Sequence, residues 1–301
     1  MKKTNTGNIR RGFLFASLGS IGWGISGVCS QYLFTKYDLR ADWLTAVRML
    51  LSGLVLLLLV FRKEKMRTFA IWKNRKDVGQ LLAFALFGLL MCQYTFLGAI
   101  KYSNSATATV LQSLNVIFMA VIVAIQSRTR IGIQQTLAIL LSLVGTFLIA
   151  TKGNPTRMQL SAAGLVLGLL AAAGVVIYTL LSRPIISDWG NLSVTGWGML
   201  IGGLFLFLGT RAWILPANLD SAAWLMITVI VLIGTAVGFS AFLEGVRYIG
   251  PVKATLIGCL EPVSATVLSA LFLGTRFSMA ELLGFGLILL TVFLSVLERK
   301  G

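Results

Sequence analysis

Two ionisable residues, Glu261 and Arg48, stand deep inside apolar stretches of the sequence. A charged group at membrane depth is costly, so each of them is a candidate functional residue. A carboxylate at such a depth can contact a cationic or amine-bearing solute or take up a proton, and a guanidinium can bind a carboxylate. The two groups can also pair with each other and serve only to fix helix packing, and for Arg48 we favour that ion pair. Both interpretations predict that the two side chains lie close together.

Uncharged polar residues and aromatic residues extend the candidate site. Gln112 and Asn115 are three residues apart, so they would share one face of a helix. Aromatic walls with few polar groups suit amphipathic or aromatic metabolites, although a single tryptophan in a helix is more often a packing residue. The complete set of candidate substrate-binding residues is Glu261, Asn115, Gln112, Gln93, Tyr94, Trp23, Ser26, Tyr178 and Arg48.

The residue types that are absent or rare exclude several classes of function. The chain has no histidine, which excludes histidine-based acid–base catalysis, Ser–His triads and histidine metal sites. Its three cysteines, Cys29, Cys92 and Cys259, all lie in apolar stretches, where packing explains them better than redox chemistry. No Walker A loop is present, so ATP does not drive a reaction directly. We therefore expect no metal and no cofactor.

The composition predicts an all-α integral membrane protein. Of the 301 residues 57% are hydrophobic and only 12% are charged, about half the charged fraction of soluble domains, and the mean hydropathy is +0.88. Continuous apolar runs of about 20 residues are long enough for transmembrane helices, whereas transmembrane strands would need short alternating segments. Ten such runs are found: Gly12–Phe34, Ala41–Phe61, Val78–Ile100, Ser103–Ile125, Ile131–Thr151, Leu160–Leu181, Leu192–Ile214, Ala222–Val246, Val252–Leu273 and Met279–Leu297.

The formal net charge of +16 acquires its meaning from where the basic residues lie. A nucleic-acid partner is one interpretation, but the basic residues concentrate in alternate loops, most densely between Arg62 and Lys76. The positive-inside rule then places both termini in the cytoplasm, makes the bilayer rather than nucleic acid the partner, and predicts a multi-pass plasma-membrane protein. Tryptophans near the ends of the runs predict an interfacial belt, made of Trp43, Trp72, Trp189, Trp213 and Trp224.

The second half of the chain resembles the first, so we expect two five-helix repeats at residues 1–151 and 160–301. Because five is an odd number, the two halves would cross the membrane in opposite directions. Inverted repeats are typical of carriers that alternate access to a site near the bilayer midplane, although a duplication can also serve folding alone. Three windows match in collinear order: residues from Gly12 with those from Gly164, Thr45–Leu56 with Thr195–Leu206, and Lys101–Ile125 with Arg247–Leu271.

The third window pairs Glu261 with Asn115, two polar residues that would lie at similar depths from opposite faces. Glu261 is nine residues into the ninth run, about 14 Å from the cytoplasmic face by helix rise. Pro262 is the only proline inside a predicted span and would free a backbone carbonyl beside Glu261. Such a pair, related by the pseudo-twofold axis, is what a central site would show.

The tail of each half resembles the drug/metabolite transporter superfamily, and specifically its EamA-type branch. The second tail contains Leu260-Glu261-Pro262-Val263, which fits the Leu-x-Pro-Val pattern of the family, whereas the first tail has Leu114-Asn115-Val116 without the proline. The resemblance extends from Gly12 to Leu297. It implies ten helices, export or import of small metabolites, and a central cavity walled mainly by helices one, three, four, six, eight and nine.

We therefore expect a secondary carrier of small organic solutes that works by alternating access and is not an enzyme. The favoured role is export of amino acids, related metabolites or drugs. The alternative from another class is a membrane-embedded enzyme acting on lipid or lipid-linked substrates, which would need a carboxylate cluster or metal-binding run at the interface. The sequence does not determine the substrate, the coupling ion or the oligomeric state.

Overall fold

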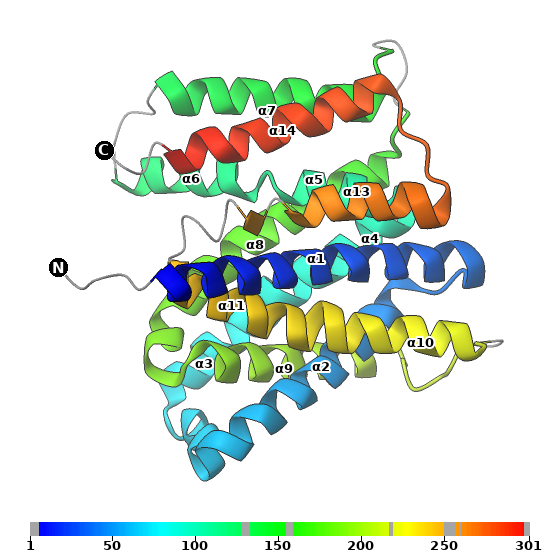
Figure 1. Cartoon of the computed structure of the whole chain (residues 1–301). Coiled ribbons are helices and arrows are strands. Elements are labelled where there is room, and N and C mark those ends of the chain that lie inside the picture. The colour runs from blue at the N-terminus through cyan, green and yellow to red at the C-terminus, as the bar shows by residue number, and fades with distance from the viewer. Residues whose placement is uncertain are drawn as a thin grey trace.

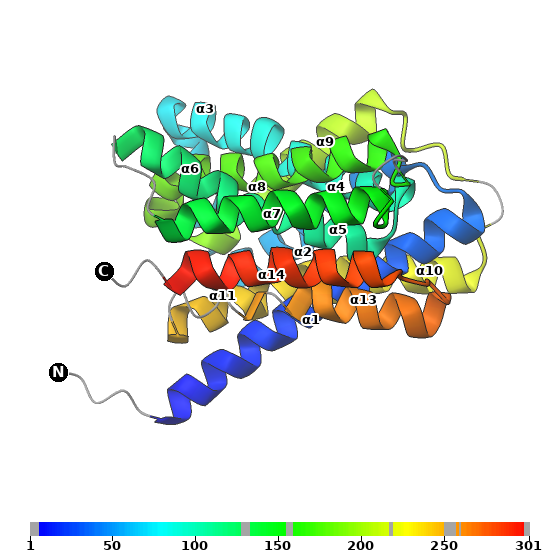
Figure 2. The same cartoon turned by 90° about the horizontal axis from the view of Figure 1, so that it is seen from above.

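The structure is a computed structural model that describes residues 6–127, 133–154, 159–216, 219–249, 257–258 and 260–297. Within these ranges every regular element is helical, and the helices form one bundle (Figure 1). The start of α1 (Thr6–Tyr37) and the end of α14 (Met279–Leu297) lie at the same end of the bundle in both views (Figures 1 and 2).

The other helices follow in chain order and agree with most of the predicted runs. In the first half they are α2 (Ala41–Glu64), the 3₁₀-helix η1 (Lys65–Lys73), α3 (Arg75–Ala83), the π-helix η2 (Phe84–Leu90), α4 (Met91–Tyr102), α5 (Ser105–Gln112), α6 (Asn115–Ser127) and α7 (Ile133–Thr151). In the second half they are α8 (Ala162–Trp189), α9 (Asn191–Gly209), α10 (Ser221–Val229), the π-helix η3 (Ile230–Val237), α11 (Gly238–Ile249) and α13 (Leu260–Leu273).

Six helical segments of the described part are long and apolar enough to cross a membrane, and four shorter apolar helices accompany them. Two predicted runs need correction, and the start of a third cannot be compared with the described residues. The fourth run is interrupted by a turn at residues 113–114, so α5 and α6 are separate helices. The seventh ends at Gly209, because the chain turns through Arg211, which has a φ of +54°. The predicted start of the ninth run, Val252, lies outside the described residues; residues 257–258 are helical, and α13 covers Leu260–Leu273.

Two prolines lie within the described helices. Pro184 lies inside α8, which extends to Trp189, well beyond the predicted end of that span at Leu181. Pro262 lies in the first turn of α13, where a missing N–H costs no helical hydrogen bond. Pro184 lies beyond the apolar segment Ala162–Ser182, so among the described residues Pro262 is the only proline within a predicted span.

Helices α2 and α9 pack along most of their length through a reciprocal pair of glycines. A Cβ placed on Gly53 would lie 2.6 Å from the backbone nitrogen of Leu200, and one placed on Gly203 would lie 2.6 Å from that of Leu50. Each glycine thus lets the backbone of the other helix approach, as small residues do between membrane helices. The two contacts are equivalent, because each helix contributes one glycine that meets the backbone of the other helix.

The two π-helices form a second matched pair. Helix η2 begins at Phe84 and η3 begins at Ile230. These two residues are 146 positions apart, the same separation as between Asn115 and Glu261. Gly88 in η2 packs against the Cβ of Tyr178 in α8, and Gly234 in η3 packs against the Cβ of Ser26 in α1. Helix α1 accordingly packs on η3 and α11, and α8 packs on η2 and α4.

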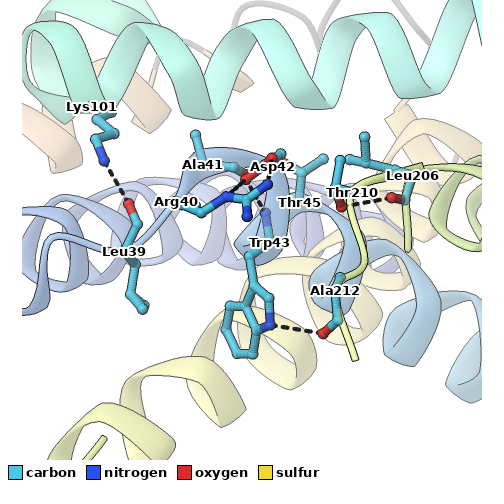
Figure 3. Close-up of polar contacts among 10 residues, drawn as sticks. All are labelled: Leu39, Arg40, Ala41, Asp42, Trp43, Thr45, Lys101, Leu206, Thr210 and Ala212. Atoms are coloured by element: carbon cyan, nitrogen blue, oxygen red, sulfur yellow. Dashed lines mark hydrogen bonds and ion pairs between the residues drawn. The ribbon is translucent and has the colours of Figure 1, made fainter. Parts of the chain in front are cut away.

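Polar contacts join the helices at the end of the bundle opposite to the start of α1. Lys101 Nζ donates to the carbonyl oxygen of Leu39 at 2.9 Å, and Trp43 Nε1 donates to the carbonyl oxygen of Ala212 at 2.9 Å (Figure 3). Trp43 is 4% exposed and belongs to a core of α1, α2 and α4 residues, so it is not part of an interfacial belt. Trp72, Trp213 and Trp224 are exposed, as the belt prediction requires.

Candidate functional site

Arg48 is the buried cation of the bundle interior. It lies seven residues into α2, and its side chain is directed into the protein with an exposure of 5%. Its Nε donates to Oγ1 of Thr235 in η3 at 3.2 Å, whereas Nη1 is buried and has no hydrogen-bond partner among the described residues. A buried donor of this kind is costly unless something satisfies it.

Glu261 lies near Arg48 without forming the ion pair that we favoured. The two charges are close enough to attract each other. However, no nitrogen–oxygen distance between them is within 4.0 Å, and the carboxylate accepts no hydrogen bond from another described residue. Thr235 takes the place of the carboxylate as the direct partner of Arg48. Neither charge is therefore neutralised by direct contact with the other.

Residues of α4, α5 and α6 lie beside Arg48 and Glu261. Cys92 is an electrostatic neighbour of Arg48 and Glu261, and Gln112 Nε2 donates to its Sγ at 3.5 Å. Asn115 Nδ2 donates to the backbone oxygen of Gln112 at 2.7 Å, across the break between α5 and α6. Gln112 and Asn115 thus do not share one face of a continuous helix; they flank a turn instead.

Helix α1 supplies two further polar atoms without partners. Trp23 Nε1 and Ser26 Oγ are buried and make no hydrogen bond within the described part of the chain. The indole packs against Phe239 and Phe242 at ring-centroid distances of 5.2 and 4.8 Å. A Cβ placed on Gly24, which lies between Trp23 and Ser26 in the sequence, would come within 2.9 Å of the backbone oxygen of Glu261, so this face of α1 borders the start of α13.

Of the three remaining candidates, only Tyr178 joins this cluster. Tyr178 of α8 is an electrostatic neighbour of Cys92 and Glu261, as a residue of the central group should be. Gln93 is 7% exposed, and its side chain forms no hydrogen bond with a described residue. Tyr94 is 42% exposed. The charge nearest to it is that of Arg40, which directly precedes α2, so Tyr94 does not belong to this cluster.

We call the group of Trp23, Ser26, Arg48, Cys92, Gln112, Tyr178, Thr235 and Glu261 the central cluster; four of its members are buried and four are partly buried. Sequence reasoning missed Thr235 and the location of Cys92. Threonine within an apolar helix usually bonds its own backbone, and nothing in the sequence marks Thr235 as the partner of an arginine 187 residues away. The cluster offers a cation, a carboxylate and an aromatic surface within one interior.

Comparison with known proteins identifies a family. The sequence profile described as the EamA-like transporter family matches residues 10–151 and again residues 162–297. The chain belongs to the EamA-like transporter family. It is thus a multi-pass membrane protein of a transporter family rather than of an enzyme family.

Relatives of this transporter carry matching names. A Salmonella typhimurium protein named "Uncharacterized inner membrane transporter YicL" is 40% identical over 98% of both chains. "Uncharacterized transporter YyaM" of Bacillus subtilis is 24% identical, covering 81% of this chain and 80% of that protein. A solved crystal structure aligns with 99% of this chain and 100% of its own at a TM-score of 0.64 and 15% identity, which shows a shared fold.

Asp220 connects α1 to α10 at the end of the transporter opposite to the start of α1. It caps α10 by accepting from the backbone N–H of Ala223, and it accepts from the hydroxyl of Tyr37; Lys36 Nζ lies 3.6 Å away. The hydrogen bond from Tyr37, followed by that from Ala223, holds the pKa of Asp220 below its ordinary value.

Proposed function

We propose that this EamA-family protein is a secondary carrier that moves small organic solutes by alternating access. Two five-helix halves, residues 1–151 and 160–301, would be related by inversion and would give ten spans. The six long apolar helices together with the four shorter ones support this number, and the two family matches divide the chain at nearly the same place. We propose a plasma-membrane location with both termini cytoplasmic.

The reciprocal contacts of the bundle support the inverted arrangement. Gly53 with Leu200, and Gly203 with Leu50, are what a pseudo-twofold axis between α2 and α9 would produce. The equivalent positions of η2 and η3 are a second, independent correspondence, and π-helical turns occur often at functional sites. Rocking of one half against the other about α2 and α9 would expose the central cluster to each side in turn.

The chemistry of the central cluster favours a solute that carries both a carboxylate and an amine. Arg48 Nη1 would donate to the carboxylate, Glu261 would accept from the ammonium group, and the ring of Trp23 would cover an apolar side chain. Amino acids and their close relatives have this combination. The buried, unpartnered Nη1 of Arg48 is the observation that carries the proposal, because a bound carboxylate would satisfy it.

Counterflow into proteoliposomes tests the proposal with three indole compounds that differ in one group each. Tryptophan has both charges, tryptamine lacks the carboxylate, and indole-3-propionate lacks the amine. The proposal expects tryptophan to exchange, each single-charge analogue to exchange poorly, and Glu261→Gln to lose the preference for tryptophan over indole-3-propionate. If amino acids with other side chains also exchange better than their single-charge analogues, this would support the same binding site for them.

A matched substitution completes that experiment. Arg276→Gln removes an exposed cation outside the central cluster, so it should leave exchange unchanged, whereas Arg48→Gln should abolish the preference for tryptophan over tryptamine. Unaltered transport and unaltered pH dependence in Glu261→Gln would refute the role of the carboxylate. Chemical conversion of the solute without exchange would point to an enzyme instead.

A further inference from the structure

The connection between α2 and α3 carries the densest basic run of the chain and has no part in the central cluster. Helix α2 alone contains 24 residues, or about 36 Å, which already exceeds a hydrocarbon core of about 30 Å. Lys65, with a φ of +50°, ends α2 and turns the chain into η1. The segment lies at the end of the bundle where α1 begins (Figure 1).

The three-residue period of η1 sorts its side chains into three stripes. Thr68 and Ile71 form the stripe that is buried against the bundle. The second stripe is apolar and exposed: Met66, Phe69 and Trp72 are 72%, 45% and 40% exposed. The third stripe presents Arg67 and Lys73 to the surroundings.

Aromatic contacts fix this segment against the bundle. Phe69 and Trp72 both pack edge-on against Trp197 of α9, with ring centroids 5.5 and 5.2 Å apart, and Phe69 packs in the same way on Phe61 of α2. Trp197 Nε1 also donates to the backbone oxygen of Thr68 at 3.0 Å. The exposed aromatic stripe is thus held in place, and such rings prefer the headgroup level of a bilayer.

The charges around this stripe are positive and exposed. None of the seven basic residues forms an ion pair with a residue that the structure describes. Two acidic residues lie nearby. Glu64 is exposed, and Asp77 accepts a hydrogen bond from Trp189 Nε1 at 3.0 Å. The seven exposed basic residues are Arg62, Lys63, Lys65, Arg67, Lys73, Arg75 and Lys76.

We propose that η1 is a binding site for anionic phospholipids. The phosphate of the headgroup would bind between Arg67 and Lys73, and the glycerol and upper acyl region would cover Met66, Phe69 and Trp72. Charge complementarity with an anionic leaflet and the exposed apolar stripe beside the basic one select this ligand over a zwitterionic lipid. The site is separate from the proposed carrier function and does not depend on it.

Native mass spectrometry of the full chain tests the site with phosphatidylglycerol and phosphatidylcholine of identical acyl chains. Phosphatidylglycerol should bind more tightly, and Arg67→Gln together with Lys73→Gln should weaken it about tenfold. The matched control, Arg211→Gln together with Arg276→Gln, removes two exposed cations from the other end of the bundle and should change affinity little. An unchanged melting temperature in both double variants shows that they remain folded.

A second arm separates lipid from a soluble phosphate. Trp72→Ala should weaken phosphatidylglycerol binding severalfold, and glycerol 3-phosphate or a short RNA should fail to displace the lipid. Equal binding of the two lipids, equal losses in the two double variants, or displacement by either soluble competitor would each overturn the proposal.

Discussion

Arg48 of α2 donates from Nε to Oγ1 of Thr235 in η3 at 3.2 Å, which joins the two halves of the chain through one buried hydrogen bond. Thr235 can accept this bond because its own hydroxyl donates to the carbonyl oxygen of Ile230, five residues earlier, in the π-helical turn. The guanidinium is therefore oriented by the π-helix, while its Nη1 is left for another acceptor.

Removing both central charges should separate stability from function. In the double variant Arg48→Met with Glu261→Gln, neither charge remains inside the bundle, so the melting temperature should be unchanged or higher. Amino-acid counterflow should be lost. Thermal unfolding and transport by the same preparation check the two effects. A large fall in melting temperature would mean that the two residues serve structure.

A side chain at Gly234 should destabilise the contact between η3 and α1. The added methyl group of Gly234→Ala would collide with Ser26 Cβ, and overpacking of this kind costs about 1–3 kcal/mol. Ser26→Gly removes the opposing Cβ, so the double variant should recover most of the loss, and a double-mutant cycle measures that coupling. Gly79→Ala, at a position with open space, is the control and should stabilise slightly. Additive effects would contradict the contact.

The glycines between α2 and α9 should respond alike to the same substitution. Gly53→Ala and Gly203→Ala each bring a Cβ within 2.6 Å of a backbone nitrogen, which cannot move as a side chain can. Both variants should therefore lower the melting temperature by similar amounts, with losses of about 1–3 kcal/mol or more. Gly286→Ala, where nothing lies near the new atom, serves as the reference. Clearly unequal losses would argue against equivalent environments.

Asp220 should make the stability depend on acid pH. Its pKa is lower in the folded protein than in the unfolded chain, so its stabilising contribution is present above its ordinary value near 3.8 and disappears as the pH falls through the lower folded value. Asp220→Asn should weaken this dependence of the melting temperature between about pH 5 and 2. Tyr37→Phe, which removes one donor and keeps the carboxylate, should have a smaller effect in the same direction. An acid dependence identical to that of the parent protein would refute the assignment.

Much of the fold could be predicted because hydrocarbon imposes one requirement on every span. Continuous apolar runs must be helical in a bilayer, and α14 begins at the predicted residue, Met279, and is helical through Leu297. The errors occur where a polar group breaks the pattern inside the protein. The break between α5 and α6 is one example, because Asn115 satisfies a backbone oxygen there that a continuous helix would have bonded itself.

The sequence by itself determined the membrane class, the helical spans, the family resemblance and which residues would be costly at depth, because these follow from composition and local periodicity. Only the tertiary structure decided the partners of those residues. Arg48 bonds Thr235 instead of Glu261, Tyr94 is exposed, and Trp23 Nε1 and Ser26 Oγ find no partner among the described residues. The physical reason is that a helix face fixes a side chain's direction only relative to its own axis. The partner depends on how closely neighbouring helices approach, which the glycines at their contacts set.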